Sequence, residues 1–393
     1  MKKIVLLGAG YASLSLLTRL GNKELSRASW TLISKDDYHY KSICLHDVAS
    51  GKHNEEVKFS LSKLNSKISV IKDEVVQILP NKVVCKGGEV EYDYLVVGLG
   101  FESDDFGVKG VKENALAITN FNTARDIFAS VLARLEAFKA SGDENELSFA
   151  VCGGGFTGIE FVGSLAQELQ KHCAKMGIEF GKVKLYCIEA MDKILPMYSA
   201  KMQAQGLRRL GELGVSVLTG AKILECKKGA VVVEQNGEQK EVAAKTIVWT
   251  AGVKGSSAVA NSPMFASVRN KVAVDANLFA NALNSNEERR ENIFIAGDCS
   301  AVLNPAINRP FPPTAQLARE QGKYLAEVFR QIIRGKTQGF EPFSFTPKGS
   351  ICSIGEGYAI AGLGKVEFSG WAASKLKAVV ESLWDLQLRG ISL

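Results

Sequence analysis

The chain has 393 residues, of which 46% are hydrophobic and 23% charged, and its formal net charge is +6 at pH 7. This length suits two or three globular domains with large cores. No stretch reaches the roughly 20 apolar residues of a membrane span, and no run of five or six basic residues suggests a nucleic-acid partner. We therefore expect neither a spanning helix nor nucleic-acid binding.

The eight cysteines form no C-x-x-C pair, so the sequence predicts neither a zinc site nor a disulfide framework. Histidines at 39, 46 and 53 lack a second cluster of ligands, and we expect no metal site. The N-terminus leads directly into an apolar strand, without a separate apolar segment and cleavage site. A signal peptide is therefore not expected, and the cytoplasm is the predicted compartment.

The first predicted unit is a strand at residues 4–8, a glycine turn and a helix, followed by a second strand at 30–33. The turn reads Gly8-x-Gly10-x-x-Ser13, with a small serine in the third position. The second strand ends in Ser34 and Lys35, where an acidic residue is usual in a site for a dinucleotide. These five residues are our candidates for binding a first dinucleotide.

Residues 83–100 predict a hairpin that leads into a buried strand, and residues 119–140 have the pattern of a helix. A second strand, glycine turn and helix follow at 147–170, with the complete motif Gly153-x-Gly155-x-x-Gly158. The next strand, residues 182–190, ends near Glu189, whose carboxylate is placed to bind both ribose hydroxyls. A carboxylate there repels a 2′-phosphate, which predicts NADH rather than NADPH.

Residues 215–252 read as short strands, and the segment NIFIAGDCSA at 292–301 returns to the style of the first unit. In it a strand ends at Gly297, and Asp298 follows in a position to face the sugar-alcohol chain of a flavin. The alternation of strands and helices favours an α/β fold with two Rossmann-like dinucleotide-binding domains. We expect an FAD domain at 1–112 and 256–335, an NAD domain at 113–255, and a C-terminal membrane-docking region at 336–393.

A family resemblance covers nearly the whole chain. Its segments are, in order, YHYKSICLHDVASG, YDYLVVGLGFES, GGGFTGIEFVG, VWTAGVKGS, IFIAGDCSA, PFPPTAQLAREQGKYLA and KGSICSIGEGYAIAGLGKVEFSGWAA. Together they resemble the type II NADH dehydrogenases, single-subunit enzymes that pass electrons from NADH through FAD to a quinone without pumping protons. The resemblance implies peripheral attachment to the cytoplasmic face of the cell inner membrane, with menaquinone or ubiquinone as acceptor; a homodimer is a further expectation.

The resemblance also suggests site residues on the quinone side. The family motif AQxAxQ falls on Ala315, Gln316, Ala318 and Glu320, so a glutamate replaces its second glutamine. Gln316 offers an amide to a quinone carbonyl; the alternative is a glutamine on the helix surface. Glu160 falls on the family's glutamate beside the flavin, where a raised pKa would suit a proton relay. The alternative for Glu160 is an acid that stabilises the start of a helix. Gly252 and Ala315 complete the expected cofactor contacts.

The stretch Trp371–Gly390 is amphipathic when projected as a helix. The predicted apolar face comprises Ala372, Leu376, Val379, Val380, Leu383, Trp384 and Leu386. This face suits either packing on the protein or a membrane interface with Trp384 at headgroup depth. Lys377, at the border of the face, is a candidate for the quinone entrance or a lysine that extends along the apolar surface to reach water.

Two other functions remain open at this stage. A sulfide:quinone oxidoreductase would need two distant cysteines at the flavin, for which Cys152 or Cys173 with Cys352 are available, but it has no use for a complete NAD site. A flavoprotein that binds NADH to signal, with slow turnover, is also compatible with the motifs, because binding sites do not report rates.

Overall fold

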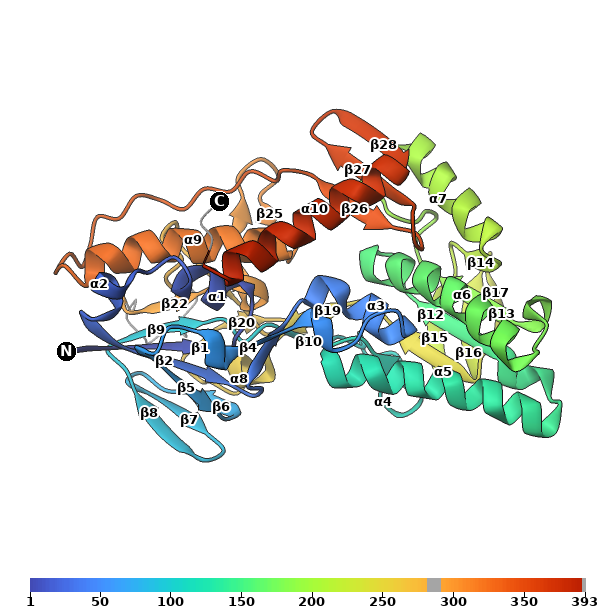
Figure 1. Ribbon diagram of the computed structural model, residues 1–393, viewed down its shortest axis with the longest axis horizontal. Coiled ribbons are helices and arrows are strands. Elements are labelled where there is room, and N and C mark those ends of the chain that lie inside the picture. Colours follow the sequence, from blue (N-terminus) through green and yellow to red (C-terminus); the bar gives the residue numbers. More distant parts are fainter. Residues whose placement is uncertain (281–290, 391–393) are drawn as a thin grey trace.

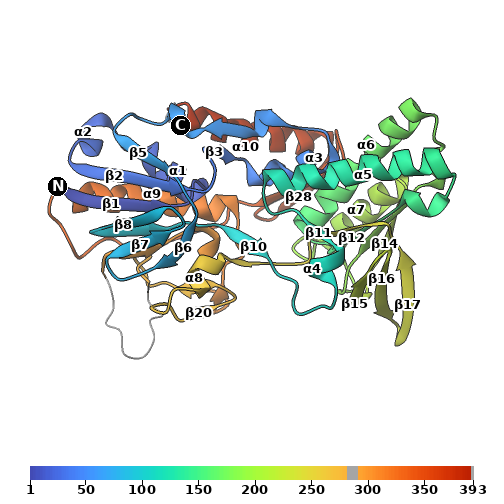
Figure 2. The same ribbon diagram turned by 90° about the horizontal axis from the view of Figure 1, so that it is seen from below.

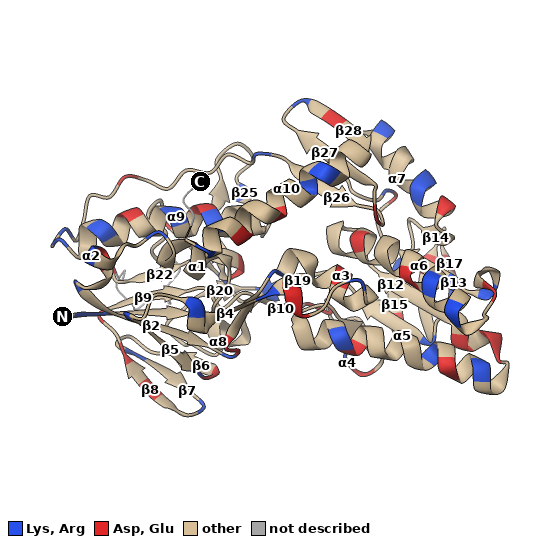
Figure 3. Ribbon diagram, viewed as in Figure 1, with Lys and Arg blue, Asp and Glu red and all other residues tan. Residues whose placement is uncertain are grey.

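The computed structural model describes residues 1–280 and 291–390. It contains two halves that lie side by side, each built on a parallel five-stranded sheet (Figures 1 and 2). Basic and acidic residues are interspersed over the described parts of both halves (Figure 3). None of the described helices is long and apolar enough to cross a membrane.

The first sheet combines strands from both ends of the chain. Its order is β22-β9-β1-β2-β5, all parallel, and its strands are β1 (Lys2–Leu7), β2 (Ala28–Ser34), β5 (Ile68–Lys72), β9 (Tyr94–Val97) and β22 (Ile293–Ile295). Strand β1 ends in four buried apolar residues, as expected for a central strand covered on both faces. Helices α1 (Tyr11–Leu17) and α9 (Ala315–Ile332) pack against each other, and the antiparallel strands β6 (Val75–Ile78), β7 (Lys82–Cys85) and β8 (Gly88–Glu91) form a separate small sheet.

The second sheet has the order β11-β18-β12-β13-β14. Its strands are β11 (Leu116–Ala117), β12 (Ser148–Cys152), β13 (Lys184–Ile188), β14 (Val215–Leu218) and β18 (Thr246–Trp249). Helices α5 (Phe121–Ser141), α6 (Phe156–Met176) and α7 (Ala200–Glu212) belong to this half, with an antiparallel sheet of β15 (Lys222–Lys227), β16 (Ala230–Gln235) and β17 (Glu238–Ala243). Twelve residues of α6 are buried, because the helix is covered by the sheet on one side and by the C-terminal strands on the other.

Two antiparallel strands join the halves, namely β10 (Phe101–Ser103) and β19 (Val253–Gly255). The predicted strand–turn–helix units, the hairpin and the long helix after residue 119 are all present. The remaining short elements are α2 (Asn22–Leu25), β3 (Tyr38–Tyr40), α3 (Leu45–Ser50), β4 (Lys58–Ser60), α4 (Val111–Asn114), α8 (Ser257–Ala260), β20 (Ser267–Val268), β21 (Lys271–Ala273), β23 (Ser300–Ala301), β24 (Leu303–Asn304) and β25 (Arg309–Pro310).

The C-terminal region packs on both halves. An antiparallel sheet of β26 (Ser350–Ser353), β27 (Ala359–Leu363) and β28 (Val366–Gly370) lies against α6 and α7, and α10 (Trp371–Leu388) then runs back toward α1 and α9 (Figure 1).

The side of helix α10 that faces the protein interior is not the predicted one. Trp384 is only 1% exposed and packs inside the protein, so its predicted place at the membrane headgroups is wrong. Lys377 and Glu381 also turn inward, with side chains 14% and 27% exposed, whereas Val379 and Leu383 are exposed. Polar side chains of α10 can point inward because buried partners on neighbouring elements form hydrogen bonds and ion pairs with them. A helical projection contains no information about such partners.

Candidate active site

The first glycine turn joins β1 to α1 beside a large cavity. Gly8 has φ +86°, and a Cβ on it would lie 2.3 Å from the carbonyl oxygen of Gly98, so only glycine fits this close approach. Gly10 caps the N-terminus of α1. The cavity has a volume of about 720 Å³, and the predicted residues among those that line it are Gly8, Gly10, Ser34, Lys35, Gly297, Asp298 and Ala315. The structure therefore brings together seven of the eight residues predicted for FAD; the eighth, Ser13, is fully buried and does not line the cavity.

The cavity has the chemistry that FAD requires. Backbone N–H groups at the start of α1 favour a pyrophosphate, and the volume falls within the usual range of ligand sites. Burial raises the pKa of the Asp298 carboxyl, an effect that nearby Lys271 opposes. The residues that line the cavity therefore suit an FAD molecule in chemistry and in size.

The three motif glycines of the second turn, between β12 and α6, have different surroundings. Gly153 has φ +120°, and a Cβ on Gly158 would lie 1.8 Å from the Gly153 carbonyl oxygen, so these two positions need glycine for the turn itself. A Cβ on Gly155 meets no atom within 4 Å, which leaves that residue open toward a ligand. The helix N-terminus at Gly155 thus offers an approachable anion site.

Glu189 follows β13 and is tied to the second turn. One oxygen of its carboxylate accepts a hydrogen bond from the Gly154 N–H at 2.6 Å, and the other accepts one from the Met191 N–H at 2.8 Å. Gly252 lies three residues after β18, the neighbouring strand of the same sheet. The glycine turn, Glu189 and Gly252 therefore share the carboxyl edge of the sheet, which is where open α/β sheets bind ligands.

The predicted quinone-side residues lie in the first turns of α9. The Gln316 carbonyl accepts a hydrogen bond from the Lys348 N–H at 3.0 Å, and Glu320 forms an ion pair with the Lys348 ammonium at 3.0 Å. Both residues thus hold the segment that precedes β26.

Glu160 and Lys377 meet in the interior, although 217 residues separate them. The Lys377 ammonium donates to the Glu160 carboxylate at 2.5 Å, and Ser353 donates to the same oxygen through its N–H and hydroxyl, each at 3.0 Å. The side chain of Lys377 is 14% exposed and that of Glu160 is 11% exposed. This pair joins α10 and β26 to α6.

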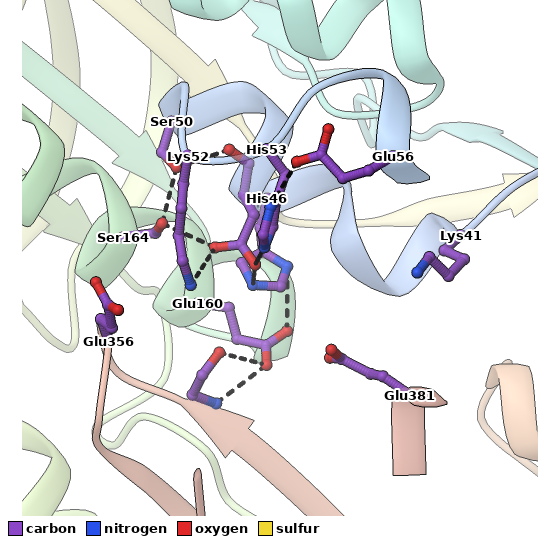
Figure 4. A network of polar contacts seen from close by, with 12 residues as sticks. Lys41, His46, Ser50, Lys52, His53, Glu56, Glu160, Ser164, Glu356 and Glu381 are labelled. Carbon is purple, nitrogen blue, oxygen red and sulfur yellow. Dashed lines mark hydrogen bonds and ion pairs between the residues drawn. The ribbon is translucent and has the colours of Figure 1, made fainter. Parts of the chain in front are cut away.

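A row of alternating carboxylates and imidazoles extends from this pair toward solvent (Figure 4). Glu160 lies 3.7 Å from His46 Nδ1, and the other nitrogen of His46 lies 3.5 Å from Asp47. Asp47 is 3.8 Å from His53 Nε2, and His53 Nδ1 is 2.8 Å from Glu56, whose side chain is 59% exposed. Glu160 and His46 are 11% and 4% exposed, and side-chain exposure then rises through Asp47 and His53 to Glu56.

Comparison with known proteins decides the family. The family model for pyridine nucleotide-disulphide oxidoreductases matches residues 2–322. A type II NADH:quinone oxidoreductase of Staphylococcus epidermidis is 36% identical over 401 residues, which span all of this chain and 97% of that protein. One from Staphylococcus aureus is 35% identical over 402 residues, with the same coverage. The chain belongs to the type II NADH:quinone oxidoreductases.

Solved structures agree on the fold of this type II NADH:quinone oxidoreductase. The NDH2 structure from Plasmodium falciparum in complex with NADH superposes with a TM-score of 0.88 at 20% identity, covering 99% of this chain and 96% of that one. The sulfide:quinone oxidoreductase from Aquifex aeolicus gives 0.78 at 20% identity, with coverages of 100% and 93%.

The three cysteines considered for sulfur chemistry, Cys152, Cys173 and Cys352, do not suit it. All eight cysteines of the chain are free and buried. Burial raises the pKa of the Cys173 and Cys352 thiols, and contact with Cys226 together with burial raises that of Cys152. A nucleophilic cysteine needs a lowered pKa and access to its substrate, so the sulfide reading has no support at these positions.

The predicted rise in the pKa of Glu160 is wrong. Burial alone would raise the pKa of the Glu160 carboxyl, but Lys377, His46 and the Ser353 N–H together hold that pKa below its usual value. Lys377 remains protonated beside Glu160, because the nearby carboxylates raise its pKa although burial lowers it. The sequence indicates the burial of Glu160 but not the contact with Lys377, which lies 217 residues away.

Sequence reasoning also missed several polar residues of the type II NADH:quinone oxidoreductase. Gln321 is fully buried and accepts a hydrogen bond from the Gly297 N–H at 2.7 Å, which holds the turn beside the cavity. His46 was considered only as a metal ligand, and Asp47 and Ser353 were not singled out. Their only signal in the sequence was polar residues within otherwise apolar stretches.

Proposed function

We propose that this chain oxidises NADH and reduces a membrane quinone with FAD as the carrier, without pumping protons. The observation that supports the proposal is the presence of two glycine turns, one on each parallel sheet, with the first opening on a cavity of about 720 Å³. When bound, FAD accepts a hydride from NADH and delivers two electrons to the quinone. The protein supplies position and electrostatics.

NADH is the proposed ligand of the second turn, with Gly153, Gly155, Gly158, Glu189 and Gly252 as its contacts. Each Glu189 oxygen already accepts one backbone hydrogen bond and retains a lone pair for a ribose hydroxyl. The fixed negative charge disfavours a 2′-phosphate, which supports NADH over NADPH.

FAD is the proposed ligand of the first turn. Gly8, Gly10 and Ser13 shape the turn for the pyrophosphate, Ser34 and Lys35 border the ribose position, and Gly297, Asp298 and Ala315 border the flavin end. We propose 1–112 and 256–335 as the FAD domain, 113–255 as the NAD domain and 336–393 as the C-terminal region.

The quinone is proposed to bind near the start of α9. Because the Gln316 carbonyl is engaged by Lys348, its NH₂ group is the part that would donate to a quinone carbonyl. Glu320 acts through Lys348, which it holds in place. Lys377 orients the Glu160 carboxylate at the inner end of the site.

Protons for the reduced quinone are proposed to pass through Glu160. Each imidazole in the row from Glu56 to Glu160 faces a carboxylate with both nitrogens, so it could accept a proton on one side and release one on the other. Of the four gaps only that between His53 and Glu56, at 2.8 Å, is a hydrogen bond, and the other three, at 3.5–3.8 Å, must shorten for a proton to pass. Burial lowers the pKa of His46, so its resting form is neutral and able to accept a proton.

We further propose peripheral attachment to the cytoplasmic face of the inner membrane. The docking face comprises Leu363, Val366, Val379, Val380 and Leu383, which are exposed apolar residues of the β27–β28 hairpin and of α10. The hairpin packs beside the N-terminal part of α10, and Lys365 and Lys375 supply positive charge for anionic lipid headgroups. A homodimer through the same face is the competing occupant.

The deciding experiment follows flavin absorbance of the purified holoprotein under anaerobic conditions. NADH should bleach the flavin at least as fast as the enzyme turns over, and a short-chain quinone should restore its colour. Bleaching without restoration by quinone would favour a protein that senses NADH, and a flavin that NADH leaves oxidised would contradict the proposed function.

A further inference from the structure

The C-terminal end of α10 reaches the first glycine turn through one histidine. Trp384 and His39 are 1% and 2% exposed. The Trp384 Nε1 donates a hydrogen bond to His39 Nε2 at 3.1 Å, and His39 Nδ1 lies 2.8 Å from the carbonyl oxygen of Ala9. Ala9 stands between Gly8 and Gly10, and all three residues and His39 line the cavity.

The chemistry of the indole fixes the direction of these bonds. An indole N–H donates only, so His39 Nε2 must be the acceptor and the ring hydrogen must reside on Nδ1. His39 therefore donates to the Ala9 carbonyl. Burial lowers the pKa of His39 to about 4, which keeps this neutral form at physiological pH.

Neighbouring contacts hold Trp384 in place. The Arg319 guanidinium lies 5.0 Å from the centre of the indole, and the Tyr11 ring lies 4.9 Å from it. Gln387, one turn further on, accepts hydrogen bonds from Arg19 and Arg319, each at 3.2 Å. The end of α10 is thus attached to α1 and α9, the two helices whose first turns border the cavity.

The anchored carbonyl constrains the amide that follows it. A trans peptide group is planar, and its C=O and N–H point in opposite directions. When His39 holds the Ala9 carbonyl, it therefore also fixes the direction of the Gly10 N–H, at the start of α1. A free carbonyl would let this peptide group rotate more easily, since Gly10 on its one side tolerates many backbone conformations.

We propose that Trp384 is a positioning residue for the flavin site, which holds the Gly8–Gly10 turn in its binding form through His39. The inference rests on the proposed assignment of FAD to this cavity. It makes one helix responsible both for the proposed docking face, on its outer side, and for retention of the cofactor, on its inner side.

The test is the FAD dissociation constant of deflavinated protein, measured by quenching of flavin fluorescence on reconstitution. Trp384→Phe keeps an aromatic ring but removes the N–H, and we expect it to weaken FAD binding about 3- to 10-fold, the loss of one net hydrogen bond. Trp371→Phe is the matched control on the same helix, because Trp371 is 67% exposed. It should leave the constant unchanged.

A double-mutant cycle separates positioning from general packing. If Trp384 acts through His39, then Trp384→Phe should add little further loss to a His39→Leu variant. Additive losses would overturn the inference, as would an unchanged FAD constant in Trp384→Phe. Should Trp384→Phe fail to fold, His39→Leu alone must still weaken FAD binding. A wild-type protein that binds no FAD would instead contradict the proposed function.

Discussion

At the scale of single residues, the buried pair of Glu160 and Lys377 combines a structural and a chemical role. Two charges in the interior are tolerated because each satisfies the other and Ser353 supplies further donors. The same arrangement leaves one carboxylate oxygen toward His46. A carboxylate that is fixed on one side and faces an imidazole on the other is positioned for proton transfer, but its lowered pKa makes it a weaker proton acceptor than the raised pKa expected from the sequence would.

Glu160→Gln should separate the two half-reactions. The variant keeps the shape of the side chain but removes its proton-carrying group, so we expect quinone turnover to fall about 10²- to 10⁴-fold. Reduction of the flavin by NADH, measured anaerobically by stopped flow, should stay unchanged. Glu168→Gln is the matched control, since Glu168 is also buried on α6 and paired with a lysine. Full quinone turnover in Glu160→Gln at every pH would remove Glu160 from the mechanism.

Lys377→Met should reverse the pH dependence that Glu160 contributes to stability. In the wild type the pKa of Glu160 is lowered, so its stabilising contribution is present above the unfolded pKa and is lost as the pH falls through the folded value. Without Lys377, burial dominates and raises that pKa, which makes the carboxylate destabilising at neutral pH by about 3–5 kcal/mol. Acidification protonates the carboxyl and reduces this deficit.

Denaturant unfolding of both proteins at pH 7.5 and pH 5 measures this difference. Lys375→Met, on the exposed side of the same helix, serves as the control. A stability deficit of Lys377→Met that is small, or that grows toward pH 5, would contradict the assigned charges.

At the scale of elements, the two glycine turns were predictable because their constraints are local. Each motif follows from backbone geometry that a few consecutive residues determine, and the structure places Gly8, Gly153 and Gly158 in the expected close approaches. The row through His46 and Asp47 was not predictable, because it depends on α3 meeting α6 across more than 100 residues of sequence. The inward direction of Lys377 and Trp384 has the same cause, since their partners lie on other elements.

Alanine at two glycines of the second turn should have different effects. Gly158→Ala places a Cβ against the Gly153 carbonyl and should destabilise the fold or distort the turn. A Cβ on Gly155 meets no protein atom within 4 Å, so Gly155→Ala should fold normally and raise the KM for NADH by obstructing the ligand.

Thermal unfolding and NADH kinetics with a fixed quinone check this contrast. Gly211→Ala, at an open position within α7, is the control for an added methyl group that does not involve the ligand. A normal KM in a folded Gly155→Ala protein would remove NADH from this turn.

At the scale of the whole molecule, the C-terminal region connects features that the two sheets alone would leave separate. Strand β26 supplies Ser353 to Glu160, α10 supplies Lys377 to the same carboxylate, and the end of α10 reaches the flavin turn. The family and the division into dinucleotide units followed from motifs along the chain. How residues 336–390 pack on both units required the three-dimensional structure.

The proposed docking face should bind anionic membranes through apolar insertion. Val379→Asp combined with Leu383→Asp places charges on the exposed side of α10. Val379 is 55% exposed and Leu383 is 37% exposed. We expect co-sedimentation with phosphatidylglycerol-containing vesicles to be lost, since charged groups are costly to bury in lipid. Turnover with a short-chain quinone should persist, because that substrate reaches the site from water. Val268→Asp, at a residue 78% exposed on β20, is the matched control. If the double variant still sediments with vesicles but changes from dimer to monomer, the face is an interface between two copies, and the membrane contact must lie elsewhere.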